Sequence, residues 1–173
     1  SDQAPLSVSS GVDSDSVSPE DALASLRGRR DAGEPLPGPD APLNLAGQHL
    51  IKADLAGLDL SRCDFSGAEL SGADLRGTRL VGAKMSGTVL HGAKLDDAEL
   101  LGAELATADF SNVSAQRAGF GRATLRGASF FEADLKGSTF SGSNLRDCDL
   151  RVAKLDGSRA VEADFRDADL GGA

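Results

Sequence analysis

The sequence predicts an all-β protein in which most of the chain winds into one long coil, preceded by a tail with a short helix. Residues 44–173 repeat with a period of five. Leu or Phe fills 22 of the 25 positions reached by counting in fives from Leu50 to Leu170. The chain of 173 residues has 21 Gly and seven Phe but no Trp or Tyr. Its interior must therefore be narrow and built mainly from leucine-sized side chains.

The first part of the chain, residues 1–43, is rich in Ser, Pro, Asp and Gly and does not repeat. It offers too little apolar surface to offset the entropy of ordering, so the sequence predicts a disordered or tethered tail. A short helix near residues 19–30 interrupts this tail, because Ser18 is a good capping residue and Pro19 suits the first helical position. We expect this helix to cap the first coil, which would otherwise expose apolar ends and strand edges.

The repeat that follows has a fixed internal order. Two positions before each Leu or Phe the residue is no larger than Val, with Gln48 and Leu58 as the exceptions. A helix would spread residues spaced by five around its whole surface, and a straight strand would send them to alternate faces. A short extended segment followed by a tight turn fits better. It points both the small residue and the Leu or Phe inward, and it places the frequent Gly at the corner.

Residues 45–172 resemble the pentapeptide repeat family, whose pattern is small–Asp/Asn–Leu/Phe–polar–Gly. The segments ADLRG at 73–77, ADFSN at 108–112 and SNLRD at 143–147 carry the resemblance. It implies a right-handed quadrilateral parallel β-helix, which is a solenoid with four repeats in each coil. At twenty residues a coil, residues 44–173 would form about 6 coils.

Two parts of the repeat predict irregular structure. Val113 and Ala115 underfill the interior, and Asn112 and Arg117 replace Gly at corners, so we expect local looseness or a bulge over residues 111–120. No cap is predicted for the last coil. We therefore expect self-association through the uncapped C-terminal coil, a partner that masks it, or a chain that is a fragment of a longer protein.

Residues twenty apart become neighbours in successive coils, which predicts columns of like side chains on the surface. The first candidate partner-binding surface is an arginine column of Arg126, Arg146 and Arg166, where Asp147 and Asp167 directly follow the last two arginines. The second is an acidic column of Glu69, Asp109, Asp149 and Asp169, which Val89 and Ser129 interrupt. The third is Phe131 at a corner. Each surface also has a purely structural interpretation. The arginine column can be a solvated ladder of ion pairs, the acidic column can reflect the acid that the repeat pattern favours, and Phe131 can be an ordinary exposed apolar residue.

The sequence contains no set of residues that predicts catalysis. His49 and His91 are the two histidines, and they would lie about two coils and so roughly 10 Å apart, too far to share a metal ion. Cys63 and Cys148 occupy small inward positions on different faces, so we expect buried, reduced and inert thiols. There is no Ser-His-acid set and no phosphate-binding glycine loop. The sequence therefore predicts that the protein is not an enzyme and uses no cofactor or metal.

Composition and charge bear on location and partners. No apolar run is long enough to span a membrane, and the N-terminus lacks the pattern of a secretory signal. The net charge is −9, which argues against direct binding of nucleic acid. We therefore expect a cytoplasmic protein whose partner is another protein.

Three functions remain open. The first is a non-catalytic scaffold for protein–protein interaction, which suits a rigid rod with regular, mixed-charge faces. The resemblance implies the second, because some members of the family mimic duplex DNA, bind DNA gyrase and confer quinolone resistance. The charge argues against it, since residues 44–173 carry a net −4 and residues 1–43 carry −5, whereas a duplex of roughly 30 Å carries about 18 negative charges. The third is a module of a larger secretion or assembly complex.

Overall fold

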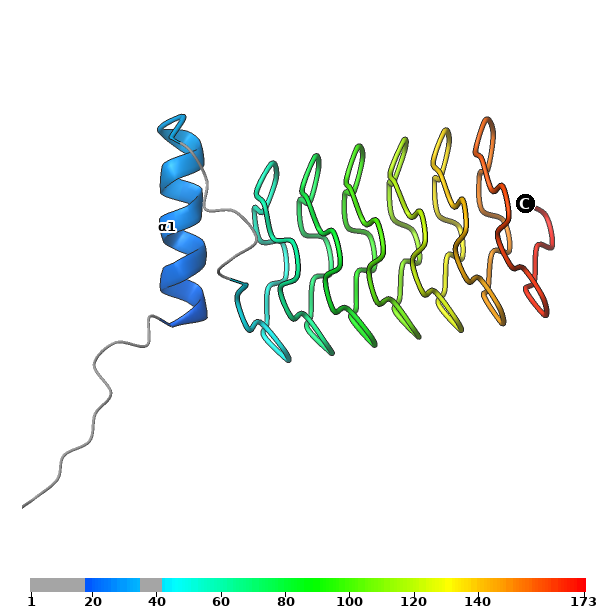
Figure 1. The fold of residues 1–173 in the computed structure, drawn as a ribbon, viewed down its shortest axis with the longest axis horizontal. Helices are drawn as coiled ribbons and strands as arrows, with labels where there is room; N and C mark the ends of the chain where they lie inside the picture. The colour runs from blue at the N-terminus through cyan, green and yellow to red at the C-terminus, as the bar shows by residue number, and fades with distance from the viewer. Residues whose placement is uncertain (1–17, 35–41) are drawn as a thin grey trace, which may run out of the picture.

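The structure is a computed structural model that describes residues 18–34 and 42–173. The helix α1 (Pro19–Asp31) lies across one end of a straight stack of coils that leads to the C-terminus (Figure 1). Most of the predicted tail, residues 1–17 and 35–41, lies outside the described residues. We therefore divide the chain into a tail with a capping helix, 1–43, and a repeat domain, 44–173, as a proposal.

The residues at both ends of α1 are types that favour the start and the end of a helix. The Ser18 hydroxyl accepts a hydrogen bond from the backbone N–H of Asp21 at 3.1 Å, and proline takes the first helical position. Acidic residues fill the first turn and arginines the last, so both ends complement the helix dipole. Leu23 and Leu26 are buried at 1% and 8% exposure, which shows that this helix packs against the coils.

The coils are built from parallel backbone contacts with a constant register. Twenty-two isolated bridges join each residue to the one twenty positions later, from Asn44↔Asp64 to Asp149↔Asp169. Four five-residue repeats therefore complete one coil, and among the described residues no strand extends beyond a single bridge. Backbone hydrogen bonds connect each coil to the coil before it and to the coil after it. Glu69 N donates to Gln48 O at 2.9 Å in the coil before, and Leu70 N donates to Val89 O at 2.7 Å in the coil after.

The corners require a left-handed backbone. From Gly47 to Gly172 the second residue of every turn has a φ between +54° and +75°, and twelve of these residues are not glycine. Asn and Asp tolerate this region through local hydrogen bonds of their side chains. Two members of the set are β-branched, Thr107 at +56° and Val152 at +59°. The Thr107 hydroxyl donates to the carbonyl of Ala106, whereas the Val152 side chain can form no such hydrogen bond.

Replacing Val152 with glycine is expected to stabilise the protein by about 0.5–1 kcal/mol. The change relieves a left-handed backbone that costs a β-branched residue about 1–2 kcal/mol, and this gain exceeds the added freedom of glycine in the unfolded chain. Little packing is lost, because the Val152 side chain is 51% exposed. Urea denaturation measures the difference. Asn112→Gly is the matched control and should change stability less, and a Val152→Gly variant weaker than the wild type would contradict the strain argument.

The interior is a stack of leucine and phenylalanine side chains. Phe110 stacks on Phe130 with ring centroids 4.8 Å apart, and Phe120 stacks on Phe140 at 5.0 Å. The two stacks meet edge to face, with 5.7 Å between the centroids of Phe110 and Phe120. Ala115 lies between these two in the sequence and is fully buried.

The bulge predicted over residues 111–120 is absent from the structure. The bridges Lys94↔Ser114 and Ser114↔Asp134 keep the twenty-residue register through this stretch. That prediction was wrong because the phenylalanine rings meet across the space that Ala115 leaves, so the interior is filled. At the corners, Asn112 and Arg117 adopt the same positive φ as the glycines.

Candidate functional site

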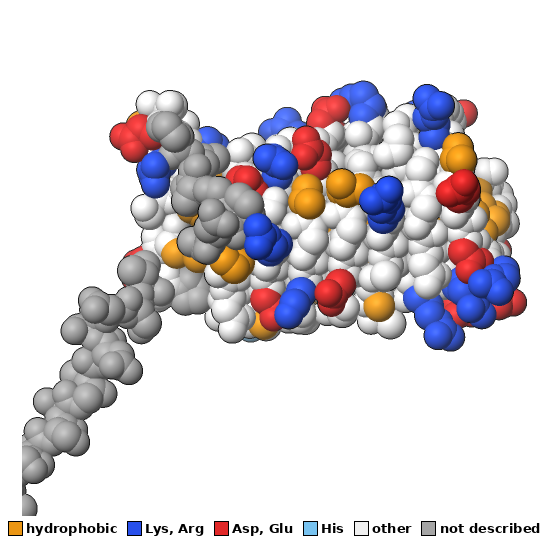
Figure 2. Space-filling model, viewed as in Figure 1, with side chains coloured by type: hydrophobic (Ala, Val, Ile, Leu, Met, Phe, Trp, Pro, Cys, Tyr) orange, Lys and Arg blue, Asp and Glu red, His pale blue; other side chains and the backbone are white. Residues whose placement is uncertain are grey.

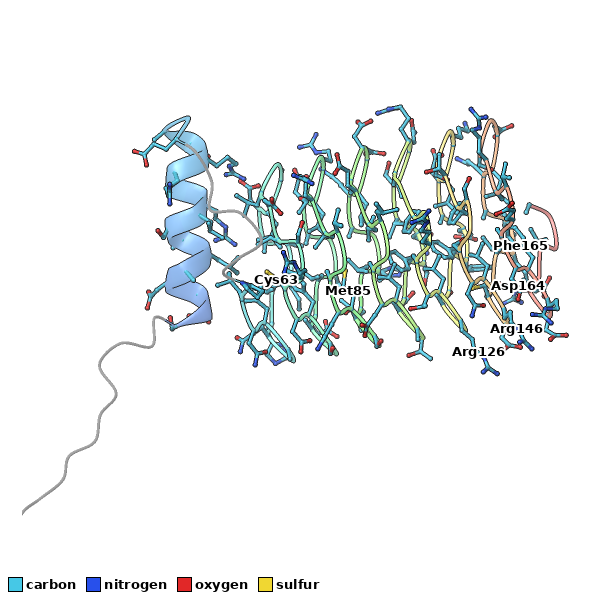
Figure 3. All side chains as sticks on the ribbon, in the orientation of Figure 1. Cys63, Met85, Arg126, Arg146, Asp164 and Phe165 are labelled. Atoms are coloured by element: carbon cyan, nitrogen blue, oxygen red, sulfur yellow. The ribbon has the colours of Figure 1, made fainter. Side chains whose placement is uncertain are left out.

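The arginine column is held by the backbone ladder. Gly127 N donates to Arg146 O at 2.9 Å, and Asp147 N donates to Arg166 O at 3.1 Å, so the three arginine corners follow one another coil by coil. Arg126 and Arg146 lie at the same edge of the rod towards the C-terminal end (Figure 3). In the face seen in Figure 2, basic and acidic side chains are interspersed, and several basic groups lie together near the C-terminal end of the rod. The column is therefore part of a surface of mixed charge.

Two of the three arginines are paired with neighbouring carboxylates. Arg126 Nε lies 2.9 Å from an oxygen of Asp147, the aspartate that follows Arg146 in the sequence. Arg166 pairs instead with Asp164, at 2.6 Å, and this contact lowers the pKa of that carboxyl to about 2. Both arginine side chains remain widely exposed, at 66% and 70%. Paired but exposed guanidinium groups can still exchange their partner for another acid at little cost.

Arg146 differs from its two neighbours. Its residue is half-buried, and its Nε is enclosed without a hydrogen-bond partner among the described residues. The aliphatic stem thus packs along the rod while no ion pair holds the guanidinium group within the described part of the chain.

An Arg146→Ser variant is therefore expected to keep nearly the stability of the wild type. An arginine of this surface contributes about 0–1 kcal/mol to the free energy of unfolding. Thermal denaturation followed by circular dichroism measures the change, with Arg126→Ser, which breaks a visible ion pair, as the comparison. A loss much larger than this would mean that the Arg146 side chain supports the interior.

The acidic column is also in register. The bridges Glu69↔Val89, Val89↔Asp109 and Asp149↔Asp169 place its members in successive coils. Most of its carboxylates are engaged in their own turns, as when Asp149 Oδ1 accepts from Arg151 N at 3.1 Å. The hydrogen bond from the Arg151 side chain also holds the pKa of Asp149 below its usual range. This column mainly stabilises corners, which leaves it less free than the arginine column.

The predicted aromatic anchor is partly covered. The Phe131 residue is half-buried, and the guanidinium carbon of Arg151 lies 5.4 Å from its ring centroid. A cation over an aromatic face is attracted to it, so a partner would first have to displace the arginine. The structure thus places Phe131 at the corner the sequence predicts, but beneath a neighbour that the sequence did not reveal.

The chemistry-bearing residues are dispersed. Within residues 18–34 and 42–173, no three His, Cys, Asp or Glu side chains lie close enough to hold a metal ion. Cys63 and Cys148 are free and buried. Burial raises the pKa of both thiols, that of Cys148 to about 12, so neither forms a reactive thiolate at neutral pH. Cys148 instead donates to Leu125 O in the neighbouring coil.

The structure adds one contact that the sequence did not predict, between α1 and the first coil. Arg30 donates to both carboxylate oxygens of Asp54, at 2.9 and 2.8 Å, and this pair lowers the pKa of Asp54 and raises that of Arg30. Beside this clamp lies a groove of about 350 Å³. Its lining is Glu20, Leu23, Arg27, His49, Leu50, Ile51 and Ala53. A second hollow, of about 490 Å³, lies at the opposite end of the rod around residues 152–156 and 172–173.

Of the helical residues described, none forms a helix with the length and apolar character needed to cross a bilayer.

Comparison with known proteins agrees with this geometry. Eight copies of the pentapeptide repeats model match residues 44–77, 73–112, 108–147 and 143–173. A trypsin-treated form of QnrB1, a plasmid-mediated fluoroquinolone resistance protein, is 27% identical over 76% of this chain and 72% of its own, with a TM-score of 0.51. A pentapeptide repeat protein of the Arabidopsis thaliana thylakoid lumen is 33% identical over 62% of this chain and 71% of its own, with a TM-score of 0.47. No curated protein matches the sequence.

Proposed function

Since this chain belongs to the pentapeptide repeat family, we propose that it is a non-catalytic scaffold that binds a protein partner along the side of its rod. The observation that carries this proposal is the unbroken twenty-residue register of the coils. It holds outward side chains in fixed columns, so a partner meets a surface that needs little ordering on binding. A fold by itself does not determine a function, and the features of this rod that distinguish it are the side chains of its surface columns.

The arginine column is the surface that we propose for this partner. Its outer members, Arg126 and Arg166, keep about two thirds of their side chains exposed. Guanidinium groups bind carboxylates in a planar, two-pronged manner, which suits an acidic segment of a partner protein. By contrast, the carboxylates of the acidic column are largely engaged in their own turns.

The experiment compares two triple variants of the full chain in affinity capture from cells. In the first, Arg126, Arg146 and Arg166 become serine, and in the second, Glu69, Asp109 and Asp149 become their amides. We expect a protein that the wild type and the acidic-column variant retain and that the arginine-column variant loses. Equal retention by both variants would exclude the arginine column, and melting curves check that each variant is folded.

The likeness to QnrB1 supports a second candidate function. Its description as a fluoroquinolone resistance protein suggests that this chain binds DNA gyrase as a mimic of duplex DNA. The charge is the weak point, because residues 44–173 carry a net −4. Dose-dependent inhibition of gyrase supercoiling by the purified protein, or protection of gyrase from a quinolone, would favour this function. If a large excess of the protein has no effect on gyrase in either assay, gyrase binding is excluded and the scaffold function remains.

The proposal includes a cytoplasmic location and no cofactor. The cytoplasmic location is supported by the two cysteines, which are free and buried, as suits a reducing compartment. Assembly into a larger secretion or assembly complex is a special case of the scaffold, and the captured partner would identify it.

A further inference from the structure

One side of the rod carries an ordered pattern of charge on two neighbouring columns, which we call the charged face. Its first column is Asp74, Lys94, Ser114, Asp134 and Lys154, and its second is Arg76, Asp96, Gln116, Lys136 and Asp156. Successive bridges from Asp74↔Lys94 to Asp134↔Lys154 hold the first column in register. The backbone ladder does the same for the second, as when Asp97 N donates to Gln116 O at 2.9 Å. All ten residues are exposed or half-buried.

The order of charges in each column is reversed in sign when the column is read from its other end. The first column runs negative, positive, neutral, negative, positive, and the second runs positive, negative, neutral, positive, negative. A second copy laid against this face with its rod antiparallel would therefore meet each charge with the opposite one. The facing pairs would be Asp74 with Lys154, Lys94 with Asp134, Arg76 with Asp156, and Asp96 with Lys136.

The centre of the charged face also suits a two-fold axis. Such an axis brings the residue that lies on it against its own copy, where two like charges would repel. The central residues, Ser114 and Gln116, are the uncharged members of the two columns. Arg117 lies next to Gln116 at the corner, but its guanidinium group already pairs with Asp97 of its own chain at 2.7 Å. The pattern therefore fits a symmetric pair of copies at its centre as well as along its length.

Other arrangements of two copies bring like charges together. With the rods parallel, each charge of the first column would face its own copy. An antiparallel pair about Asp109 on the acidic column would set Glu69 against Asp149. Of these three arrangements, charge favours the antiparallel one about Ser114.

The lysines of the charged face have charges to offer a partner. Three of the five lysines in the sequence lie there, namely Lys94, Lys136 and Lys154. Among the described residues, none of the three takes part in an ion pair. Arg76 does pair with Asp74 of its own chain at 2.6 Å, but its side chain stays 56% exposed. Carboxylates of a second copy would therefore mostly add contacts instead of replacing existing ones.

We propose that the charged face is the interface of a homodimer, in which two copies pack side by side with antiparallel rods about a two-fold axis that passes between the two Ser114 residues. Each of the four facing pairs occurs twice, so eight ion pairs would cross the interface. Five coils about 4.8 Å apart give a face only roughly 20 Å long, so the dimer is weak and depends on salt. The arginine column lies half a coil away, so the dimer leaves that surface open to the protein partner.

Sedimentation equilibrium of the full chain tests the dimer. At low ionic strength, we expect the mean molar mass to rise with concentration from the 17.7 kDa of one chain towards twice that value. It should return to one chain in about 1 M salt, where charges are screened over roughly 3 Å. A mass of one chain at every concentration in low salt would overturn the dimer, and growth beyond two chains would overturn the closed two-fold arrangement.

Charge reversal at one facing pair tests the arrangement. Lys94→Glu and Asp134→Lys each place like charges opposite one another, so each variant alone should have a dissociation constant about tenfold higher or more. An equal mixture of the two variants should recover the wild-type affinity, because the two reversed charges then face each other across the interface. Lys84→Glu is the matched control, since it makes the same change of charge on the opposite face of the rod, and it should dimerise as the wild type does.

Two results would contradict the arrangement. A mixture that stays as weak as either variant alone, although melting curves show that both are folded, would overturn the pairing of positions 94 and 134. An equal effect of Lys84→Glu and Lys94→Glu would show that net charge controls association, which would overturn the charged face as the interface.

Discussion

A Phe130→Asp variant is expected to be unfolded at room temperature. Phe130 is fully buried, stacks on Phe110 at 4.8 Å between ring centroids and meets Phe120 edge to face at 5.7 Å. Loss of a buried phenylalanine alone costs about 3–5 kcal/mol, and a carboxylate without a partner in an apolar interior adds several kcal/mol. Together these costs approach or exceed the roughly 5–15 kcal/mol by which a domain is stable. Circular dichroism and the absence of a cooperative melting transition measure this outcome.

The matched control for this variant is Ser141→Asp. Ser141 is an exposed corner residue eleven positions further along the chain, and the change adds the same charge. We expect this control to melt within a few degrees of the wild type, because surface substitutions usually change stability by less than about 0.5 kcal/mol. A Phe130→Asp variant that melts like this control would show that residues at multiples of five do not form the interior.

The coil could be predicted from the sequence because its physical requirement recurs at every repeat. A position such as Leu100 must be large and apolar, and the position two residues earlier, Ala98, must be small, in each of the four faces. Because the period is short, many independent positions report the same geometry, and errors at single repeats do not matter. The family match over residues 44–173 confirms the resemblance drawn from these positions.

Individual side-chain contacts could not be predicted from the repeat pattern. The prediction of a bulge near Ala115 was wrong because the phenylalanines that fill the interior there lie on other faces of the coil, and the prediction considered only the residues of one segment. The clamp between Arg30 and Asp54 joins residues that no repeat relates. The placing of Arg151 over Phe131 depends on rotamers and neighbouring coils. Columns follow from the register, whereas the pairing within them follows from side-chain geometry.

One exception in the sequence does carry information about α1. At the small inward position, Thr78, Ala98 and the later members of the same column stay small, but the first coil has Leu58. This leucine is fully buried and belongs to the same apolar cluster as Leu23 and Leu26 of α1. A large side chain is admissible there because no preceding coil crowds it, and we infer that it fills space beneath the helix. The break in the pattern thus marks the coil that the helix covers.

A Leu58→Ala variant is accordingly expected to lose about 2–5 kcal/mol of stability, although alanine is the commonest residue at this position of the repeat. The loss arises because Leu58 is fully buried at the covered end of the rod, where truncation leaves a cavity. Urea denaturation measures it, and Leu101→Ala is the matched control, since Leu101 is 50% exposed and should lose less than about 1 kcal/mol. Equal losses in the two variants would mean that Leu58 obeys the general rule of the repeat and that α1 rests on the first coil without depending on it.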